Sequence, residues 1–279
     1  MENIVKTGTP TRARAATLVT VGPPARLAEA AGVLAEADEA GSLRHVLIST
    51  TGEDVPDVEG LQDVTVENVR PQFLNNAVAA LRLSSLPTVV WWRGGPPDRL
   101  PAVATLADRV LLDAEDSLPL WRQAPALFGR TALTDFRWAR LTRWRGVMAL
   151  LFDLPQVREA APDFQRLRIT GNDPAQCALF AGWLASSLDW QGRVAVELER
   201  AGASASLSKV ELDGPSASLQ LALHRNGACL TTEARVNGDV LTSRVLSLGS
   251  QALPSLLSEE LRLRSRDIPF ERALQQMAS

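Results

Sequence analysis

LPTVVWWRGGPP, residues 86–97, is the stretch that most clearly predicts the fold of this 279-residue chain. A continuous apolar run ends at a pair of glycines and a pair of prolines, which is typical of a buried strand followed by a turn. Similar short apolar runs occur at residues 15–21 (AATLVTV), 45–49 (HVLIS) and 109–113 (RVLLD). Because these runs are continuous rather than alternating, they favour a mainly parallel, helix-covered sheet.

The segments between these strands have the features of helices. After two consecutive prolines, Leu27, Ala31 and Leu34 recur at helical spacing. Another helix is predicted over residues 71–83, where a proline opens the segment. In residues 64–69 the side chains on one face (64, 66 and 68) alternate with those on the other (65, 67 and 69). This pattern predicts a more exposed edge strand. The first half is therefore expected to be an α/β domain.

The second half changes character, and it predicts an α+β domain with antiparallel hairpins. Asn226–Gly227 and Asn237–Gly238 are strong signals for type I′ hairpin turns. Alternation predicts one buried face on each of two strands, formed by Val194, Val196 and Leu198 and by Leu219, Leu221 and Leu223.

Further elements of this half follow from helix signals and apolar runs. Residues 166–170 predict a strand, and Asp173 with a following proline begins a helix whose apolar stripe includes Cys177. The last helices are expected near residues 255–262 and 270–277. Prolines at 155 and 162 mark the predicted boundary, which gives domains of residues 1–153 and 154–279.

Composition excludes several classes of protein. Hydrophobic residues make up 46% and charged residues 22%, as in ordinary globular chains. The formal net charge of −3 gives no global basic field, so we expect no nucleic-acid partner. No apolar run approaches the roughly 18 residues that span a bilayer, and the N-terminus lacks a secretory signal. We therefore expect a cytoplasmic protein that has no membrane partner.

Motifs for cofactors, metals and catalysis are missing. The turn after the first strand carries one glycine and two prolines, instead of the GxGxxG that lets a backbone approach a pyrophosphate. The glycine pair at 94–95 lacks the GK[ST] of a P-loop, and no HExxH, CxxC or GxSxG occurs. His45 and His224 are expected to be structural or surface residues. We therefore predict no cofactor and no metal, and the motifs supply no catalytic group; catalysis by paired carboxylates that meet only in the folded chain stays open.

Tryptophan and arginine between positions 91 and 145 are the unusual feature. Trp and Arg are enriched at the energetic centres of protein interfaces. If Thr142 caps a helix, Arg143 and Arg145 fall in its first turn, where cations oppose the helix dipole unless an anion docks there. Burial of the tryptophans in the core, ion pairing with Asp135 or Asp153 and simple solvation are the alternatives. The candidate residues for partner or anion binding are Trp91, Trp92, Arg93, Trp138, Arg140, Arg143, Trp144 and Arg145.

The same segments carry a resemblance to a known family. Residues 86–97 resemble the LPxVxWWxGxPP segment of the OpcA family, the glucose-6-phosphate dehydrogenase assembly proteins. Residues 135–145 (DFRWARLTRWR) and 150–153 (LLFD) are similar to that family's DLxWxRLTPWRxxLAxLFD stretch. Residues 107–113 (ADRVLLD) and 181–186 (AGWLAS) also resemble family segments.

The resemblance implies a function without catalysis. Members of the family combine an α/β half with an α+β half, and they bind glucose-6-phosphate dehydrogenase to promote its assembly or to activate it allosterically. This chain would then support the oxidative pentose phosphate pathway and the supply of NADPH without binding NADP itself. Two alternatives stay open from the residues alone. One is an enzyme that handles sugar phosphates or nucleotides, and the other is a small-molecule sensor module, each on an α/β scaffold.

Overall fold

The structure, a computed structural model, describes residues 14–38, 41–50, 64–67, 69–190, 192–200, 202, 205–224, 227–263 and 265–278. The chain divides into two compact units, Met1–Val110 and Leu111–Ser279, and the division falls within one strand. The boundary predicted after Asp153 differs from this division. Pro155 is the first residue of a helix, because a ring-fixed φ suits that position, and it therefore does not mark a linker.

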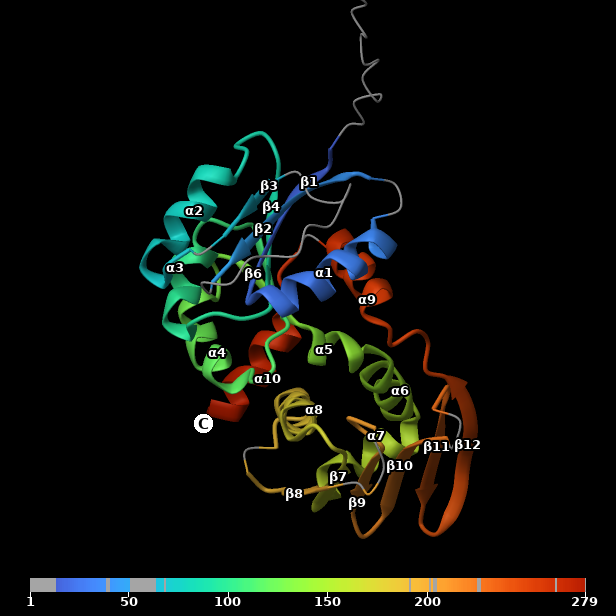
Figure 1. The fold of residues 1–279 in the computed structure, drawn as a ribbon. Helices are drawn as coiled ribbons and strands as arrows, with labels where there is room; N and C mark the ends of the chain where they lie inside the picture. The colour runs from blue at the N-terminus through green and yellow to red at the C-terminus, as the bar shows by residue number, and fades with distance from the viewer. Residues whose placement is uncertain are drawn as a thin grey trace, which may run out of the picture. The chain divides into compact units, whose positions relative to one another are not determined.

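The first unit alternates strands and helices, as the apolar runs predict. Its elements are β1 (Ala16–Gly22), α1 (Pro24–Ala37), β2 (Leu43–Ser49), β3 (Val64–Val66), the 3₁₀ turn η1 (Pro71–Phe73), α2 (Leu74–Leu81), β4 (Thr88–Trp92), η2 (Pro97–Arg99), α3 (Leu100–Ala104) and β5 (Arg109–Leu112). Figure 1 shows α1 on one side of the strands and α2 and α3 on the other. This covering explains why β1, β4 and β5 are buried along their whole length.

The first sheet has the strand order β3-β2-β1-β4-β5-β6, where β6 is Ala132–Asp135. The pairs β1–β2, β1–β4 and β2–β3 are parallel. The predicted edge strand near residue 64 is confirmed, since β3 stands at the end of the sheet. The expected fold class of the first half is therefore correct.

The second unit combines helices with a second sheet. Its other elements are α4 (Leu118–Gln123), η3 (Ala124–Leu127), α5 (Phe136–Arg140), α6 (Thr142–Phe152), α7 (Pro155–Ala160), η4 (Ala161–Asp163), β7 (Arg166–Thr170), α8 (Pro174–Ser187), β8 (Ala195–Glu199), β9 (Lys209–Asp213), β10 (Ala217–Leu223), β11 (Cys229–Val236), β12 (Asp239–Ser247), α9 (Leu253–Arg262) and α10 (Ile268–Ala278).

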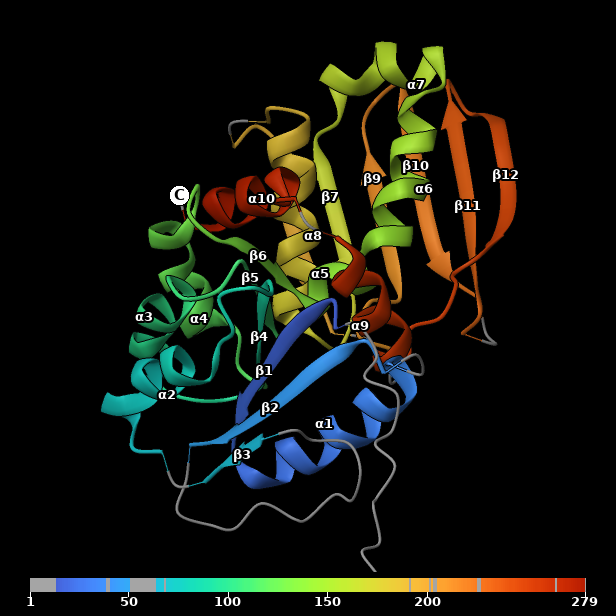
Figure 2. The ribbon, with the colours of Figure 1, turned by 90° about the horizontal axis from the view of Figure 1, so that it is seen from above.

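The second sheet has the order β12-β11-β10-β9-β7-β8, and all of its pairs except β7–β8 are antiparallel. Helices α6, α7 and α8 pack on one face (Figure 2). The turn predicted at Asn237–Gly238 joins β11 to β12, and both residues have positive φ as a type I′ turn requires. For the other predicted turn, Gly227 also has positive φ between β10 and β11, whereas Asn226 lies outside the described residues.

One predicted buried face is wrong. Val194 is buried, but Val196 and Leu198 on β8 are each 46% exposed. The reason is the position of β8 at the edge of the second sheet, where only β7 flanks these side chains along the sheet. By contrast, Leu219 and Leu221 lie on a strand in the interior of the sheet and are fully buried as predicted, whereas Leu223 at the end of that strand is half-buried.

Candidate functional site

The strand order of the first sheet reverses beside β1, since β2 lies on one side and β4 on the other. Open α/β sheets bind ligands in the crevice outside the carboxyl ends of the strands at such a point. In this chain the loops concerned follow β1 at Gly22–Pro23 and follow β4 at Arg93–Gly94. These loops are therefore the first place to test for a ligand site.

The side chain of Arg93 lies at this point and is engaged within the protein. Its Nη1 donates to the carbonyl oxygen of Arg26 at 2.7 Å, and its Nη2 contacts a Glu29 carboxylate oxygen at 3.1 Å. The guanidinium also lies 4.7 Å from the ring centroid of Trp91. Arg93 is buried, so this cation stabilises the start of α1 instead of presenting charge at the surface.

The two loops also pack closely against each other. A Cβ atom placed on Gly94 would lie only 2.7 Å from Cδ of Pro23. Helix α1 begins at a pair of prolines, and proline has no N–H to offer a phosphate. The local geometry at this point is therefore unlike that of a dinucleotide site.

We expect Arg93→Ala to lower the free energy of unfolding by about 2 kcal/mol, since it leaves the Arg26 carbonyl without this donor and opens buried space. The matched change Glu29→Ala removes only the partly exposed partner and should cost less than about 1 kcal/mol. Urea unfolding followed by circular dichroism measures both values. If both variants lost the same free energy of unfolding, the ion pair with Glu29, and not the hydrogen bond to the Arg26 carbonyl, would be the stabilising contact.

The candidate residues Trp91 and Trp92 are both fully buried. They are consecutive on β4, so their rings point to opposite faces of a sheet that helices cover on both sides. The alternative that they belong to the core is confirmed, so neither ring is available at the surface to a partner.

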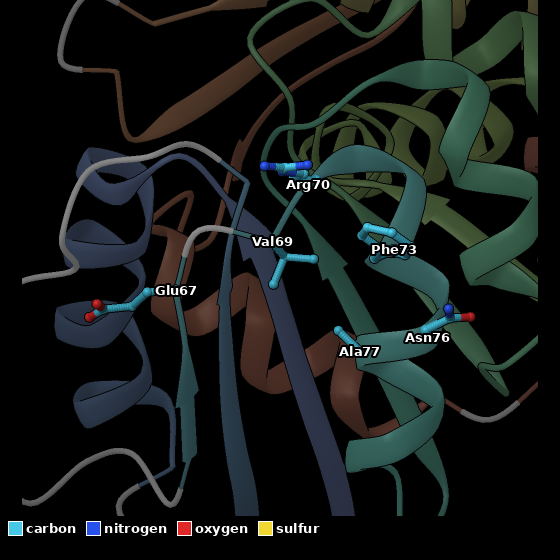
Figure 3. Close-up of a pocket in the computed structure, with 6 residues that line it drawn as sticks. All are labelled: Glu67, Val69, Arg70, Phe73, Asn76 and Ala77. Carbon is cyan, nitrogen blue, oxygen red and sulfur yellow. The ribbon is translucent and has the colours of Figure 1, made fainter.

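A hollow of about 600 Å³ opens elsewhere in the first unit, where the chain leaves β3 and enters α2. Figure 3 shows Arg70 and Phe73 beside it, with Val69 and Ala77 between the strand and the helix. Phe73 is half exposed, and Arg70 is exposed. The flat ring of Phe73 beside the guanidinium of Arg70 suits a planar anionic ligand. No sequence motif marks this hollow.

The candidate residues of the second unit lie on two helices that meet at Leu141. Asp135 is the N-cap of helix α5, and its carboxylate accepts from the Arg137 N–H at 2.7 Å. Leu141 is the N-cap of α6, and Thr142 is its first residue. The predicted N-cap at Thr142 is therefore wrong. Only one residue separates the helices, and the hydroxyl of Thr142 accepts from Arg145 at 3.1 Å.

Trp138 and Arg145 form a stack inside the second unit. The guanidinium carbon of Arg145 lies 3.5 Å from the ring centroid of Trp138, and the indole N–H donates to Asp267 at 2.6 Å. Burial lowers the pKa of Arg145 to about 10, while Asp267 and Glu260 oppose this shift. The stack therefore joins α5 and α6 to the segment before α10.

The other candidates of this unit differ in exposure. Trp144 is buried in the core, and Arg140 is half-buried. Arg143 is exposed, and its Nε donates to the carbonyl oxygen of Ser247 at the end of β12 at 2.8 Å. For Trp138 and Trp144, too, the alternative of burial in the core is confirmed. Arg143 is thus the candidate that presents most clearly to solvent.

Sequence reasoning missed a buried polar network around Asp135. This carboxylate also accepts from Ser117 at 3.0 Å and from the Trp121 indole at 2.9 Å. Arg137 donates to Asp173 at 2.8 Å and to Ser117 at 2.6 Å. Burial raises the pKa of Asp135, against the opposing effects of Arg137 and the hydrogen bonds. The one local signal was an aspartate directly before a helix.

Other chemistry has little support in the described residues. They contain no group of three or more His, Cys, Asp or Glu side chains that could hold a metal ion. Cys177 and Cys229 are free, and burial raises the pKa of Cys177 to about 11, which disfavours the reactive thiolate. Within the ranges that the structure describes, no helix has the length and apolar character needed to cross a membrane.

Comparisons with known proteins identify a family and relatives of this chain. Residues 131–274 match the family model that describes the C-terminal domain of a glucose-6-phosphate dehydrogenase subunit. A protein of Nostoc punctiforme named "Putative OxPP cycle protein OpcA" is 32% identical over 42% of this chain and 27% of its own length. One of Synechococcus elongatus with the same name is 30% identical over 43% and 29%. The chain thus matches less than a third of the length of these relatives.

Solved structures show the same fold at low identity. A "putative nadph-dependent oxidoreductase" from Desulfitobacterium hafniense has a TM-score of 0.54 and 11% identity, covering 95% of this chain and 93% of its own. A mutant of Gal80p from Saccharomyces cerevisiae has a TM-score of 0.52 and 11% identity, covering 89% and 83%. At this identity the likeness concerns the fold alone.

Proposed function

The chain belongs to the OpcA family, and from that membership we propose that it binds a glucose-6-phosphate dehydrogenase and promotes its assembly or activity without catalysing a reaction itself. The carrying observation is the family match over residues 131–274, which includes Asp135, the stack of Trp138 and both edge strands of the second sheet. This membership supports a role in the oxidative pentose phosphate pathway.

The geometry of the first unit favours a role without catalysis. A nicotinamide dinucleotide would need the crevice at the carboxyl ends of β1 and β4. In this chain the Arg93 side chain lies there, and Gly94 packs against Pro23. The alternative of an enzyme that handles sugar phosphates or nucleotides therefore has less support. The alternative of a small-molecule sensor module with a different partner has the hollow beside Arg70 and Phe73 in its favour.

Titration of the dehydrogenase from the same organism with this chain tests the proposal. We expect a saturable rise in NADPH formation and a complex that co-migrates in size-exclusion chromatography. The chain alone should form no NADPH from glucose 6-phosphate and NADP. Absence of both binding and any effect on the rate would contradict the proposed function, and turnover by the chain alone would favour the enzyme alternative.

A further inference from the structure

The second sheet ends in a long edge strand with exposed apolar side chains. Strand β12 has nine residues and contains neither proline nor lysine, the residues that commonly protect an edge from pairing. On it, Val240 is 50% and Val245 is 64% exposed. Figures 1 and 2 both show β12 as the outermost strand of this sheet. The register with β11 shifts between Ala234 and Arg235, so the regular part of this edge is residues 242–247, and that part is suited to pairing with another chain.

The ladder with β11 determines which backbone groups of β12 face outward. The Leu248 N–H donates to the Ala228 carbonyl, and bonded and non-bonded pairs alternate along an antiparallel ladder. Ser243 and Val245 therefore direct their N–H and C=O groups away from β11. At the end of the edge, the Ser247 carbonyl accepts from Arg143. The middle of β12 therefore has outward N–H and C=O groups with which another strand could pair. Arg143 lies at the end of this segment.

An apolar groove lies beside this edge on the face that α6 covers. It has a volume of about 130 Å³ and is lined by Val147, Leu150, Leu151, Leu154, Thr232, Thr242, Arg244 and Leu246. Leu150 stands at its rim and is 60% exposed. Because side chains alternate between faces, a strand added to β12 would direct every second side chain to the groove side. The volume suits a single apolar side chain.

Charge distinguishes a partner protein from a second copy of this chain. Arg244 lies in the middle of β12, and Arg143 lies at its end. If two copies paired through β12 in registers centred on residues 243 to 245, their Arg244 side chains would stand opposite or diagonal to each other. Like charges in these positions destabilise a sheet. A segment with carboxylates would instead be attracted to both arginines.

We propose that β12 and the adjacent groove bind an extended segment of the dehydrogenase, which adds a strand to the sheet, places one apolar side chain in the groove and pairs a carboxylate with Arg244 or Arg143. This inference rests on the proposed function. A strand added to β12 would contact the outward backbone groups along the edge, the groove and Arg244 on the face that α6 covers, and Val245 on the opposite face, all within the second unit.

Single substitutions to glutamate test this surface in the full-length chain. We expect Val245→Glu and Leu150→Glu each to raise the dissociation constant for the dehydrogenase by about tenfold or more, because a charge replaces an apolar contact. Val196→Glu and Leu198→Glu are matched controls on β8, at the opposite edge of the same sheet, and should change it by less than about twofold. Melting temperatures establish that all four variants fold.

The outcomes separate this inference from the function on which it rests. If the wild-type chain fails to bind the dehydrogenase, the proposed function is wrong. If wild-type binding is strong and the β12 variants behave like the β8 controls, only the docking surface is wrong. Light scattering supplies the third result. Loss of self-association in Val245→Glu, with unchanged dehydrogenase binding, would make a second copy the occupant and overturn the inference.

Discussion

Asp135→Ala is expected to lower the free energy of unfolding by about 3–5 kcal/mol, the range found when one partner of a buried charged network is removed. The carboxylate is fully buried and accepts hydrogen bonds from the Arg137 N–H, the Ser117 hydroxyl and the Trp121 indole. Alanine leaves these three donors without their acceptor and also removes the N-cap of α5. Urea unfolding, followed by tryptophan fluorescence and circular dichroism, measures the loss.

Asp173→Ala is the matched control for this prediction. Asp173 is also an N-cap, and it also accepts from Arg137, but its side chain is partly exposed to water. Water can therefore solvate the N–H donors that lose this carboxylate, and we expect the free energy of unfolding to fall by about 1–2 kcal/mol. A loss for Asp135→Ala no larger than that for Asp173→Ala would mean that burial of the network contributes little to stability.

Gly182→Ala is expected to destabilise the protein by about 1–3 kcal/mol, although alanine is the better helix former. Gly182 lies in the middle of α8, where α10 packs against it. An added Cβ atom would lie 2.7 Å from the backbone carbonyl oxygen of Ala273 and 3.0 Å from Cγ of Met277. Because a backbone atom cannot rotate aside, the two helices would have to separate.

Gly146→Ala gives the same substitution without the contact. Gly146 lies within α6, and an added Cβ atom would have nothing within 4 Å. Removing this glycine should stabilise the chain by about 0.5–1 kcal/mol through helix propensity alone. Differential scanning calorimetry should therefore give shifts of opposite sign for the two variants. Shifts of the same sign would contradict close packing of α8 on α10.

Several strands and helix ends can be predicted from short sequence patterns, because they depend on residues that are close together in the chain. The continuous apolar run that ends at Trp92 is a covered strand, and the predicted strand at 166–170 is found with the same ends. Asp173 caps its helix as predicted, since an aspartate before a proline satisfies free N–H groups locally. Such features depend on neighbours in the sequence, so the sequence reveals them.

The candidate site was predicted less well, because exposure depends on distant segments. Trp138 looked like an interface residue, yet it stacks on Arg145 and donates to Asp267, which lies far along the chain. Arg93 looked like a surface cation, but a carbonyl of α1 accepts its hydrogen bond. Val196 and Leu198 had the pattern of a half-buried strand, and only the sheet order makes β8 an edge.

The sequence by itself determined the alternation of strands and helices in the first half, the hairpin turn at Asn237–Gly238 and the resemblance that the family match bears out. Only the tertiary structure decided that the tryptophans are core, that Asp135 is the centre of a buried network and that β12 is an open edge beside a groove. Periodicity and turn chemistry act between near neighbours, whereas burial and pairing depend on which distant segments meet.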